Sequence, residues 1–204
     1  LKELVEVVSG ESMDTYLERV FYKPMGLTRT LYNPLARFPK EEIVPTVKND
    51  FLRGGPLQGY VHDEVAAFLG GVSGNAGLFS TAQDVARIYQ MLLDKGVCGD
   101  RRYLSRATCE LFLKVKSNNS RRGLGFDKPD MDNPDKGPCA AEVPASTFGH
   151  TGFTGTCAWA DPDNELIFVF LCNRIYPRPF DRKNLMRLDI RTRMQQVMYQ
   201  SLMK

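Results

Sequence analysis

A short stretch near the C-terminal end of the sequence combines side chains that can do chemistry with residues that shape a backbone. Residues 149–156 read Gly-His-Thr-Gly-Phe-Thr-Gly-Thr, and they place the imidazole of His150 and the hydroxyl of Thr151 between glycines. An imidazole can donate a hydrogen bond or move a proton near neutral pH. A histidine on an edge strand can equally be structural, and the residues alone favour that second interpretation.

A second candidate region is rich in glycine. Residues 54–77 contain seven of the 17 glycines, interleaved with apolar residues that must be buried somewhere. Glycine is needed where a backbone turns with positive φ or closely approaches another group. The density therefore predicts a shaped loop against a site rather than a merely flexible one. Ser73-Gly74-Asn75 within this region is formally a Ser-x-Asn pattern, for which a structural role is favoured.

Metal and cofactor chemistry has little support in the sequence. The chain has only two histidines, and its five cysteines include no Cys-x-x-Cys pair, which disfavours a zinc site. His62, Asp63 and Glu64 are adjacent, so their side chains point in different directions and cannot converge on one ion without special geometry. We therefore predict no metal and no cofactor, and a structural or substrate-rim role for these three residues.

The net charge of +3 is unevenly distributed, because residues 174–204 carry +6 and the remainder carries −3. A basic end can bind nucleic acid, but this one lacks a glycine-rich contact motif and zinc-ligand spacing. A solvated helix face is the simpler explanation, so we expect no nucleic-acid partner. The longest apolar run, Leu166–Cys172, is far too short to span a bilayer, and we expect no membrane span.

The size and composition are those of one ordinary domain. The chain has 204 residues, of which 43% are hydrophobic and 25% charged, enough to bury a core. We predict a single domain over residues 1–204, with a helical and irregular region over 1–145 and strands plus a closing helix over 146–204. The chain opens on Leu1 within a helical pattern and without a starting Met, which leads us to expect a piece of something longer.

The elements around His150 are predicted to be strands. Three β-prone runs, residues 146–149, 156–160 and 166–172, predict an antiparallel sheet, with Asp161-Pro162-Asp163-Asn164 as a hairpin turn. The last run does not alternate, so we expect helices to cover both of its faces. A closing helix from about Asn184 would supply one cover through an apolar stripe. That stripe consists of Met186, Ile190, Met194, Val197 and Met198.

Helical spacing dominates the earlier part of the chain. One helix stops at Ser9-Gly10, and a second follows a Ser12 cap. The clearest helix has Ser80 and Gln83 as a capping box and ends at Gly96. A short helix from Ser105 carries Leu111 and Phe112. Residues 28–59 keep no period, and we expect an irregular connection there. Residues 116–146 are polar and proline-rich, which predicts a long surface excursion with a brief ordered stretch near Leu124–Phe126.

These elements together resemble the C-terminal part of the serine β-lactamase and penicillin-binding-protein superfamily. There, a Lys-Thr-Gly triad lies on the strand that edges the active site, and His-Thr-Gly is a variant in many class C-like and esterase-like relatives. Residues 61–64 and 70–84 are similar to the family's glycine-rich segment and following helix. Residues 1–27 are similar to its helical stretch after a Tyr-x-Asn motif. The likeness covers nearly the whole chain, with Asn75 standing where relatives commonly carry His.

The resemblance implies an α+β fold, a partial β-lactamase/transpeptidase-like domain in which helices, the closing helix included, pack a three-stranded antiparallel sheet. It also implies roles for individual residues. His150 would take the place of the triad's cationic residue, Thr151 would offer its hydroxyl, and the Phe153 backbone N–H would be an oxyanion donor. Gly152 completes the triad. Substrate-binding residues would be Asn75, Thr154 and Arg174.

The superfamily's nucleophile lies in Ser-x-x-Lys on an upstream helix, because the lysine one turn away can take the serine proton. The only such pattern here is Ser201-Leu202-Met203-Lys204, at a terminus and on the wrong side of His-Thr-Gly. We therefore expect a missing N-terminal half that carries Ser-x-x-Lys and Tyr-x-Asn. The isolated chain is expected to be inactive.

Two functions follow from the resemblance. The first is the C-terminal part of a serine hydrolase that transfers the acyl group of an amide or ester, with β-lactams and cell-wall peptides as candidate substrates. The alternative is a noncatalytic module that binds a peptide, glycan or protein. The parent protein is expected outside the cytoplasm, for instance in a periplasm, and a homodimer is an option.

Overall fold

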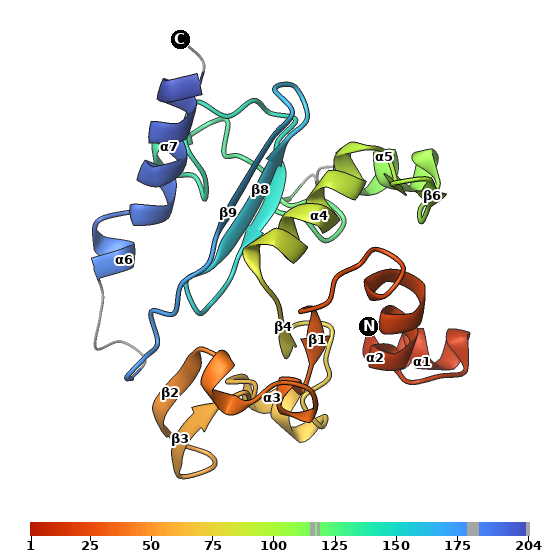
Figure 1. Ribbon diagram of the computed structural model, residues 1–204. Coiled ribbons are helices and arrows are strands. Elements are labelled where there is room, and N and C mark those ends of the chain that lie inside the picture. The colour runs from red at the N-terminus through yellow and green to blue at the C-terminus, as the bar shows by residue number, and fades with distance from the viewer. Residues whose placement is uncertain (115–116, 118, 179–183, 203–204) are drawn as a thin grey trace. The chain divides into compact units, whose positions relative to one another are not determined.

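The computed structural model describes residues 1–114, 117, 119–178 and 184–202, which form two compact units (Figure 1). The first unit comprises Leu1–Asp84 and Asn173–Arg182, and the second comprises Val85–Cys172 and Lys183–Lys204. No helix within these described residues is long and apolar enough to cross a membrane. The mixture of helices and small antiparallel sheets confirms the predicted α+β class.

The first unit begins with the two predicted helices. The helix α1 spans Lys2–Ser9 and ends at Gly10, whose φ of 73° is the left-handed conformation that glycine adopts without strain. The helix α2 spans Met13–Leu17 and continues as a π-helical turn over Glu18–Tyr22. Ser12 is the residue before α2, but its hydroxyl donates to Thr15 Oγ1 at 2.8 Å and makes no cap bond to the helix backbone.

The remaining elements of the first unit are short. Residues 28–59, expected to be irregular, contain a hairpin of β2 and β3 whose register shifts twice. Those shifts, and the proline that opens β2, hide the two-residue period from sequence inspection. The other elements are β1, β4, α3 and two 3-10 turns. The bounds are Leu31–Tyr32 (β1), Pro34–Ala36 and Lys40–Glu42 (3-10), Pro45–Asp50 (β2), Gly55–Gln58 (β3), Glu64–Phe68 (α3) and Leu78–Phe79 (β4).

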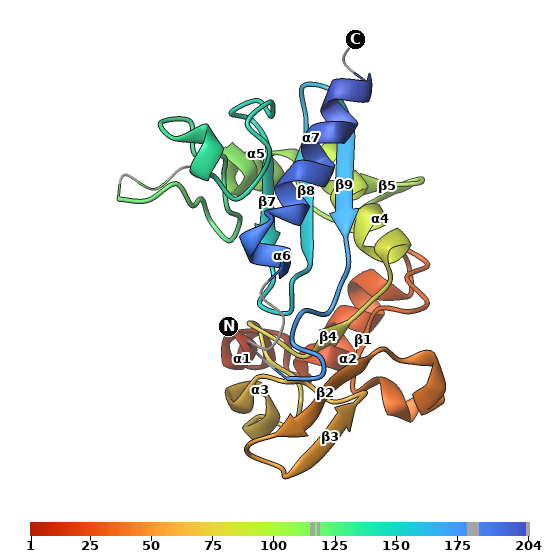
Figure 2. The ribbon, with the colours of Figure 1, turned by 90° about the vertical axis from the view of Figure 1, so that its left-hand side faces the viewer.

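The second unit contains the predicted three-stranded antiparallel sheet, in the order β7-β8-β9. In this sheet His150 lies opposite Ala158, and Trp159 lies opposite both Gly149 and Phe168. Helices α4 and α7 lie on opposite faces of the sheet (Figures 1 and 2). The bounds are Ala82–Leu93 (α4), Val97–Cys98 (β5), Arg101–Arg102 (β6), Arg106–Lys114 (α5), Pro134–Lys136 (3-10), Phe148–Thr151 (β7), Cys157–Asp161 (β8), Leu166–Phe170 (β9), Asn184–Arg187 (α6) and Ile190–Leu202 (α7).

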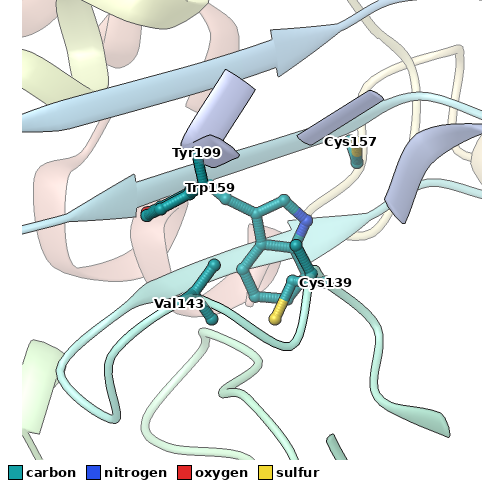
Figure 3. Close-up of a cluster of buried hydrophobic side chains, with 6 residues drawn as sticks. Cys139, Val143, Cys157, Trp159 and Tyr199 are labelled. Carbon is teal, nitrogen blue, oxygen red and sulfur yellow. The ribbon is translucent and has the colours of Figure 1, made fainter. Parts of the chain in front are cut away.

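One core cluster of the second unit lies between the sheet and α7. Trp159, 1% exposed, packs with Cys139, Val143, Cys157 and Tyr199 (Figure 3). All five residues of β9 are half-buried, and Leu166, Phe168 and Phe170 pack against this cluster. The strand was expected to be covered on both faces. Helices do lie on both faces of the sheet, but β9 is only half-buried, because it forms an edge of the sheet in the described part of the chain.

The predicted apolar stripe of the closing helix is wrong. The left-handed residue Asp189, with φ 48°, separates α6 from α7, so the helical period restarts there. Gln195 and Tyr199 are the buried residues of α7, whereas Met194 and Val197 are exposed. Each buried side chain has a polar partner. Gln195 Oε1 accepts from Ala140 N–H at 3.0 Å, and Tyr199 donates to Asp161 at 2.6 Å.

Two details of the other helices also differ from expectation. Thr81, rather than Ser80, caps α4, because its hydroxyl accepts from Asp84 N–H at 3.3 Å. Ser80 instead shares a hydrogen bond with Thr30 at 2.8 Å. The helix α5 exposes Leu111 and Phe112 and buries Cys109 and Leu113.

Candidate functional site

The candidate site lies where β7 ends and turns toward β8. Gly152 N–H donates to the Thr156 carbonyl at 2.8 Å, and Gly155 N–H donates to the Gly152 carbonyl at 3.0 Å. These bonds close a turn whose central residues are Phe153 and Thr154. Phe153 is 55% exposed, so the turn presents it at the surface of the second unit.

Two glycines of this region are required by close approach. A Cβ on Gly149 would lie 2.1 Å from the Ala158 carbonyl oxygen and 2.6 Å from the Trp159 ring. A Cβ on Gly152 would lie 2.3 Å from Thr156 Oγ1. The gap at Gly149 admits no side chain, whereas the gap at Gly152 admits one only if the Thr156 hydroxyl moves aside. The glycines of Gly-His-Thr-Gly therefore fix how tightly β7 and its turn lie against β8.

The side chains of His150 and Thr151 belong to opposite faces of the sheet, because strand residues alternate. His150 shares the face of Phe148, whose ring stacks on Tyr89 of α4 at 5.9 Å between centroids. Thr151 shares the face of Trp159. Both side chains are half-buried. A ligand that contacts both must therefore lie across the edge of β7.

The ring of His150 has a defined tautomer in this geometry. Its Nδ1 lies 2.7 Å from the Thr151 carbonyl oxygen. A carbonyl oxygen only accepts, so Nδ1 carries the proton and donates it. In the neutral ring, Nε2 is then an acceptor, and in the imidazolium Nε2 is a second donor. The ring can thus take a proton from a hydroxyl or donate to an anion, according to its charge.

The residue that lies on the outer side of β7, Asp127, belongs to no sequence motif. Asp127 N–H donates to the Gly149 carbonyl at 2.7 Å, and Gly149 N–H donates to the Asp127 carbonyl at 3.2 Å. The Asp127 side chain is buried and forms an ion pair with Arg121, with a distance of 2.8 Å between Oδ1 and Nε. Nothing in the residue types of 116–146 distinguishes this aspartate, although an ordered stretch near residues 124–126 is expected there.

A buried lysine lies next to this bridge. Lys128 Nζ donates to the carbonyls of Leu113 and Ser146 and lies 5.8 Å from the centre of the Phe148 ring. Burial lowers the pKa of Lys128, because the charged ammonium is removed from water. Because this lysine contacts two backbone carbonyls and an aromatic face, we assign it a structural role. It links the end of α5 to the segment that leads into β7.

The other predicted site residues belong to the first unit. Asn75 is exposed, and its Oδ1 accepts from the Ser73 hydroxyl at 2.6 Å. The loop around it is shaped as expected, since a Cβ on Gly77 would lie 2.2 Å from the Gly71 carbonyl oxygen. Arg174 is half-buried and follows Asn173, whose amide donates to the Pro45 carbonyl at 2.6 Å and to the Thr46 carbonyl at 2.8 Å.

The acidic pair after His62 has a structural use. Asp63 Oδ1 accepts from Ala66 N–H at 2.8 Å and so caps α3. Glu64 is exposed in the first turn of that helix. Among the residues that the structure describes, no group of three or more His, Cys, Asp or Glu side chains is placed to hold a metal ion.

The chain is similar to a known protein family and to curated relatives. The sequence model of the family described as Beta-lactamase matches residues 1–191. The protein named "Putative D-alanyl-D-alanine carboxypeptidase" in Escherichia coli (strain K12) is 37% identical over 185 residues, covering 84% of this chain and 42% of the relative. N-acetylmuramyl-L-alanine amidase of Bacillus subtilis (strain 168) is 35% identical, covering 84% and 41%. The chain thus spans less than half the length of these curated relatives.

Solved structures share the fold. A beta-lactamase from Mycobacterium bovis matches with a TM-score of 0.60 at 21% identity, covering 98% of this chain and 60% of its own. Simvastatin synthase from Aspergillus terreus matches with a TM-score of 0.63 at 16% identity, covering 98% and 52%. The predicted β-lactamase-like α+β architecture is therefore confirmed.

Proposed function

The chain belongs to the beta-lactamase family of serine hydrolases, and from this premise we propose that it forms the part of an acyl-transfer site that lacks the nucleophile. In this proposal, Ser-x-x-Lys and Tyr-x-Asn come from an N-terminal half outside the 204 residues. One observation carries the proposal: His150, Thr151 and the turn at Phe153 follow one another where β7 ends.

The proposed role of His150 depends on Nε2, which accepts a hydrogen bond in the neutral ring and donates one in the imidazolium. With Nδ1–H directed to the Thr151 carbonyl, neutral His150 accepts a hydrogen bond from a hydroxyl of the tyrosine motif. The imidazolium donates to a substrate carboxylate instead. Either contact places the ring beside the reacting acyl group, as expected for the residue that replaces the triad lysine.

The proposed role of Phe153 belongs to its backbone. Hydrogen bonds from Gly152 N–H and Gly155 N–H close the turn and fix its shape, and Phe153 is its first central residue. We assign its N–H to the oxyanion that develops when a serine attacks the carbonyl carbon. One such donor contributes about 10²- to 10³-fold in rate, because the turn positions it before the charge develops. Thr151 would donate its hydroxyl to the same substrate.

The proposed substrate is an acyl-D-alanyl peptide or a related amide or ester of the cell wall. This class is taken from the names of the curated relatives, which include a carboxypeptidase and an amidase. A cell-wall substrate also places the parent protein outside the cytoplasm. Thr154 at the turn is the proposed substrate contact in the second unit, and Asn75 and Arg174 are those in the first.

The test is acyl-enzyme formation by the protein that contains this chain. We expect the encoded protein to carry Ser-x-x-Lys upstream and to gain the mass of one penicillin on that serine. His150→Ala should lower the acylation rate by about 10²-fold, the lower end of what general acid–base groups contribute. His150→Lys should retain most of the rate, because lysine donates permanently. Arg193→Ala, an exposed residue outside every predicted site, is the control.

The result that would reject this function is equally definite. An encoded protein without the serine motif, or one that takes up no acyl group, cannot be a serine hydrolase. If such a protein still binds a cell-wall peptide at β7, its function is that of a noncatalytic binding module. Equal acylation rates in wild type and His150→Ala would show that His150 has only a structural role in β7.

A further inference from the structure

The Thr156 carbonyl accepts two hydrogen bonds from different parts of the second unit. Gly152 N–H reaches it at 2.8 Å and closes the turn. Arg191 Nη1 reaches it at 3.2 Å from α7, 35 residues further along the chain. Both bonds converge on one carbonyl, whose two lone pairs can serve both donors. The turn that follows His150-Thr151 is therefore attached to the closing helix.

Arg191 is itself held from more than one side. The helix α7 begins at Ile190, directly after Asp189, whose carbonyl accepts from Arg193 N–H at 3.0 Å and whose carboxylate accepts from Thr192 Oγ1 at 2.9 Å. These contacts fix the first turn of the helix and with it the origin of the arginine side chain. A second guanidinium nitrogen, Nη2, lies 3.5 Å from the Met186 sulfur of α6. Arg191 thus spans α6, α7 and the turn.

The turn needs such support because of its composition. Gly155 has φ 108°, a conformation that side-chain-bearing residues rarely adopt, and a Cβ on Gly152 would meet the Thr156 hydroxyl. Glycines lose more conformational freedom on ordering than other residues do. A loop built from two of them keeps one shape only when the contacts around it hold it. The guanidinium supplies such a contact, and a hydrogen bond from a charged donor is stronger than one from a neutral donor.

We propose that Arg191 is a positioning residue: through the Thr156 carbonyl it holds the 152–156 turn in the shape that presents Phe153 N–H beside His150. The catalytic consequence rests on the proposed function, whereas the effect on the turn does not. An oxyanion donor helps only when it is already oriented as the charge develops. Loss of Arg191 should therefore slow the chemical step without weakening ground-state binding.

The first test follows the turn directly and needs no activity. The protein is labelled with ¹⁵N-glycine, and hydrogen exchange of the Gly152 and Gly155 amides is compared with that of Gly149. In Arg191→Gln we expect the Gly152 amide to exchange about tenfold faster, since loss of one charge-assisted bond frees local opening. Gly149, held by Asp127, should be unchanged. The exposed neighbour Arg193→Gln is the matched control.

The second test measures kcat and KM for ester hydrolysis in the same variants of the full protein. Arg191→Gln should lower kcat about tenfold and leave KM unchanged, since the interaction is gained only in the transition state. Arg191→Lys, which keeps the charge, should recover part of the loss. Arg193→Gln should behave as wild type.

The two tests separate the two claims. A wild-type protein without activity overturns the proposed function, and the exchange result alone then decides whether Arg191 holds the turn. Unchanged exchange at Gly152 in Arg191→Gln overturns the positioning role. Equal acceleration at Gly152 and Gly149 also overturns it, because it would mean that Arg191 only stabilises the whole unit.

Discussion

The Asp50 carboxylate in the β2–β3 hairpin is held by a single arginine. Its side chain is 3% exposed, and Oδ1 and Oδ2 lie 2.8 and 2.9 Å from Arg53 Nε and Nη2. These hydrogen bonds lower the pKa of Asp50 against the opposing effect of burial. Arg53 also donates to the carbonyls of Val61 and His62, so the pair joins the hairpin to the next segment.

We therefore predict a pH-dependent cost for Asp50→Asn. Because the pKa is lower in the folded state, the pair stabilises the fold above the unfolded value of 3.8 and ceases to do so as pH falls through the folded value. The variant should unfold about 1–2 kcal/mol more easily at neutral pH, a figure reduced for the partly exposed Arg53. Denaturant titrations from neutral to strongly acidic pH should show the gap closing. A constant gap would contradict the prediction, and Glu41→Gln, an exposed carboxylate, is the control.

A second prediction at the scale of one residue separates the backbone of Phe153 from its side chain. Proline has no N–H, and it is accepted at the first central position of common β-turns. Phe153→Pro should therefore lower kcat/KM of the full protein by about 10²- to 10³-fold. Phe153→Ala keeps the N–H and should retain most of the rate. Equal losses in both variants would assign the effect to the ring or to the turn's shape.

The contact between β7 and β8 is an element-scale property that depends on one glycine. In Gly149→Ala the new Cβ would lie 2.1 Å from a backbone oxygen of the partner strand, which cannot move aside as a flexible side chain can. We expect a loss of about 2–3 kcal/mol in the free energy of unfolding, from overpacking and weakened pairing. Gly74→Ala, which would meet only the side chain of Leu1, should cost much less. Similar unfolding midpoints for the two variants would contradict the prediction, because they would show that β7 and β8 accommodate the methyl group at little cost.

The elements that sequence inspection predicts best are those with strong local signals. Helix α1 with its Gly10 stop, α4 with its end near Gly96, and the turn at Asp161 all have such signals. The β2–β3 hairpin lacks one, because two register shifts break its alternation. The buried face of α7 could not be predicted either. Its buried residues are Gln195 and Tyr199, whose hydrogen-bond partners lie far away in the sequence.

The candidate site shows the same limit at the scale of the whole molecule. The contiguous part, from His150 to Thr154, is predictable because neighbours in sequence share one strand end and turn. Asp127 and Arg191 are not, since Asp127 reaches that strand by backbone hydrogen bonds from 22 residues away and Arg191 reaches the turn by a side-chain hydrogen bond from 35 residues away. Asn75 and Arg174 lie in the other compact unit, so their substrate contacts stay a prediction. The single-domain organisation over residues 1–204 also stays a prediction.

The final prediction concerns the 204-residue chain by itself: it folds at least in part but does not hydrolyse acyl substrates. Folding can be monitored through the reactivity of the thiols, because burial raises the pKa of Cys139 to about 12 and that of Cys157 to about 11. The thiolate is the reactive form. In the folded chain these two cysteines should therefore resist iodoacetamide at neutral pH, while the half-buried Cys98 reacts. In denaturant the three should react alike.

Protected thiols make the activity measurement meaningful. A chain with Cys139 and Cys157 protected has formed the core of the second unit, so absence of turnover cannot be attributed to misfolding. We expect no hydrolysis of a chromogenic cephalosporin or a p-nitrophenyl ester, because no serine in the sequence has a lysine at the required spacing except Ser201 at the terminus. Turnover that is abolished by a substitution within the chain, for example Ser73→Ala, would show that it carries its own nucleophile. Reactive thiols in buffer would instead show that the second unit needs further chain to fold.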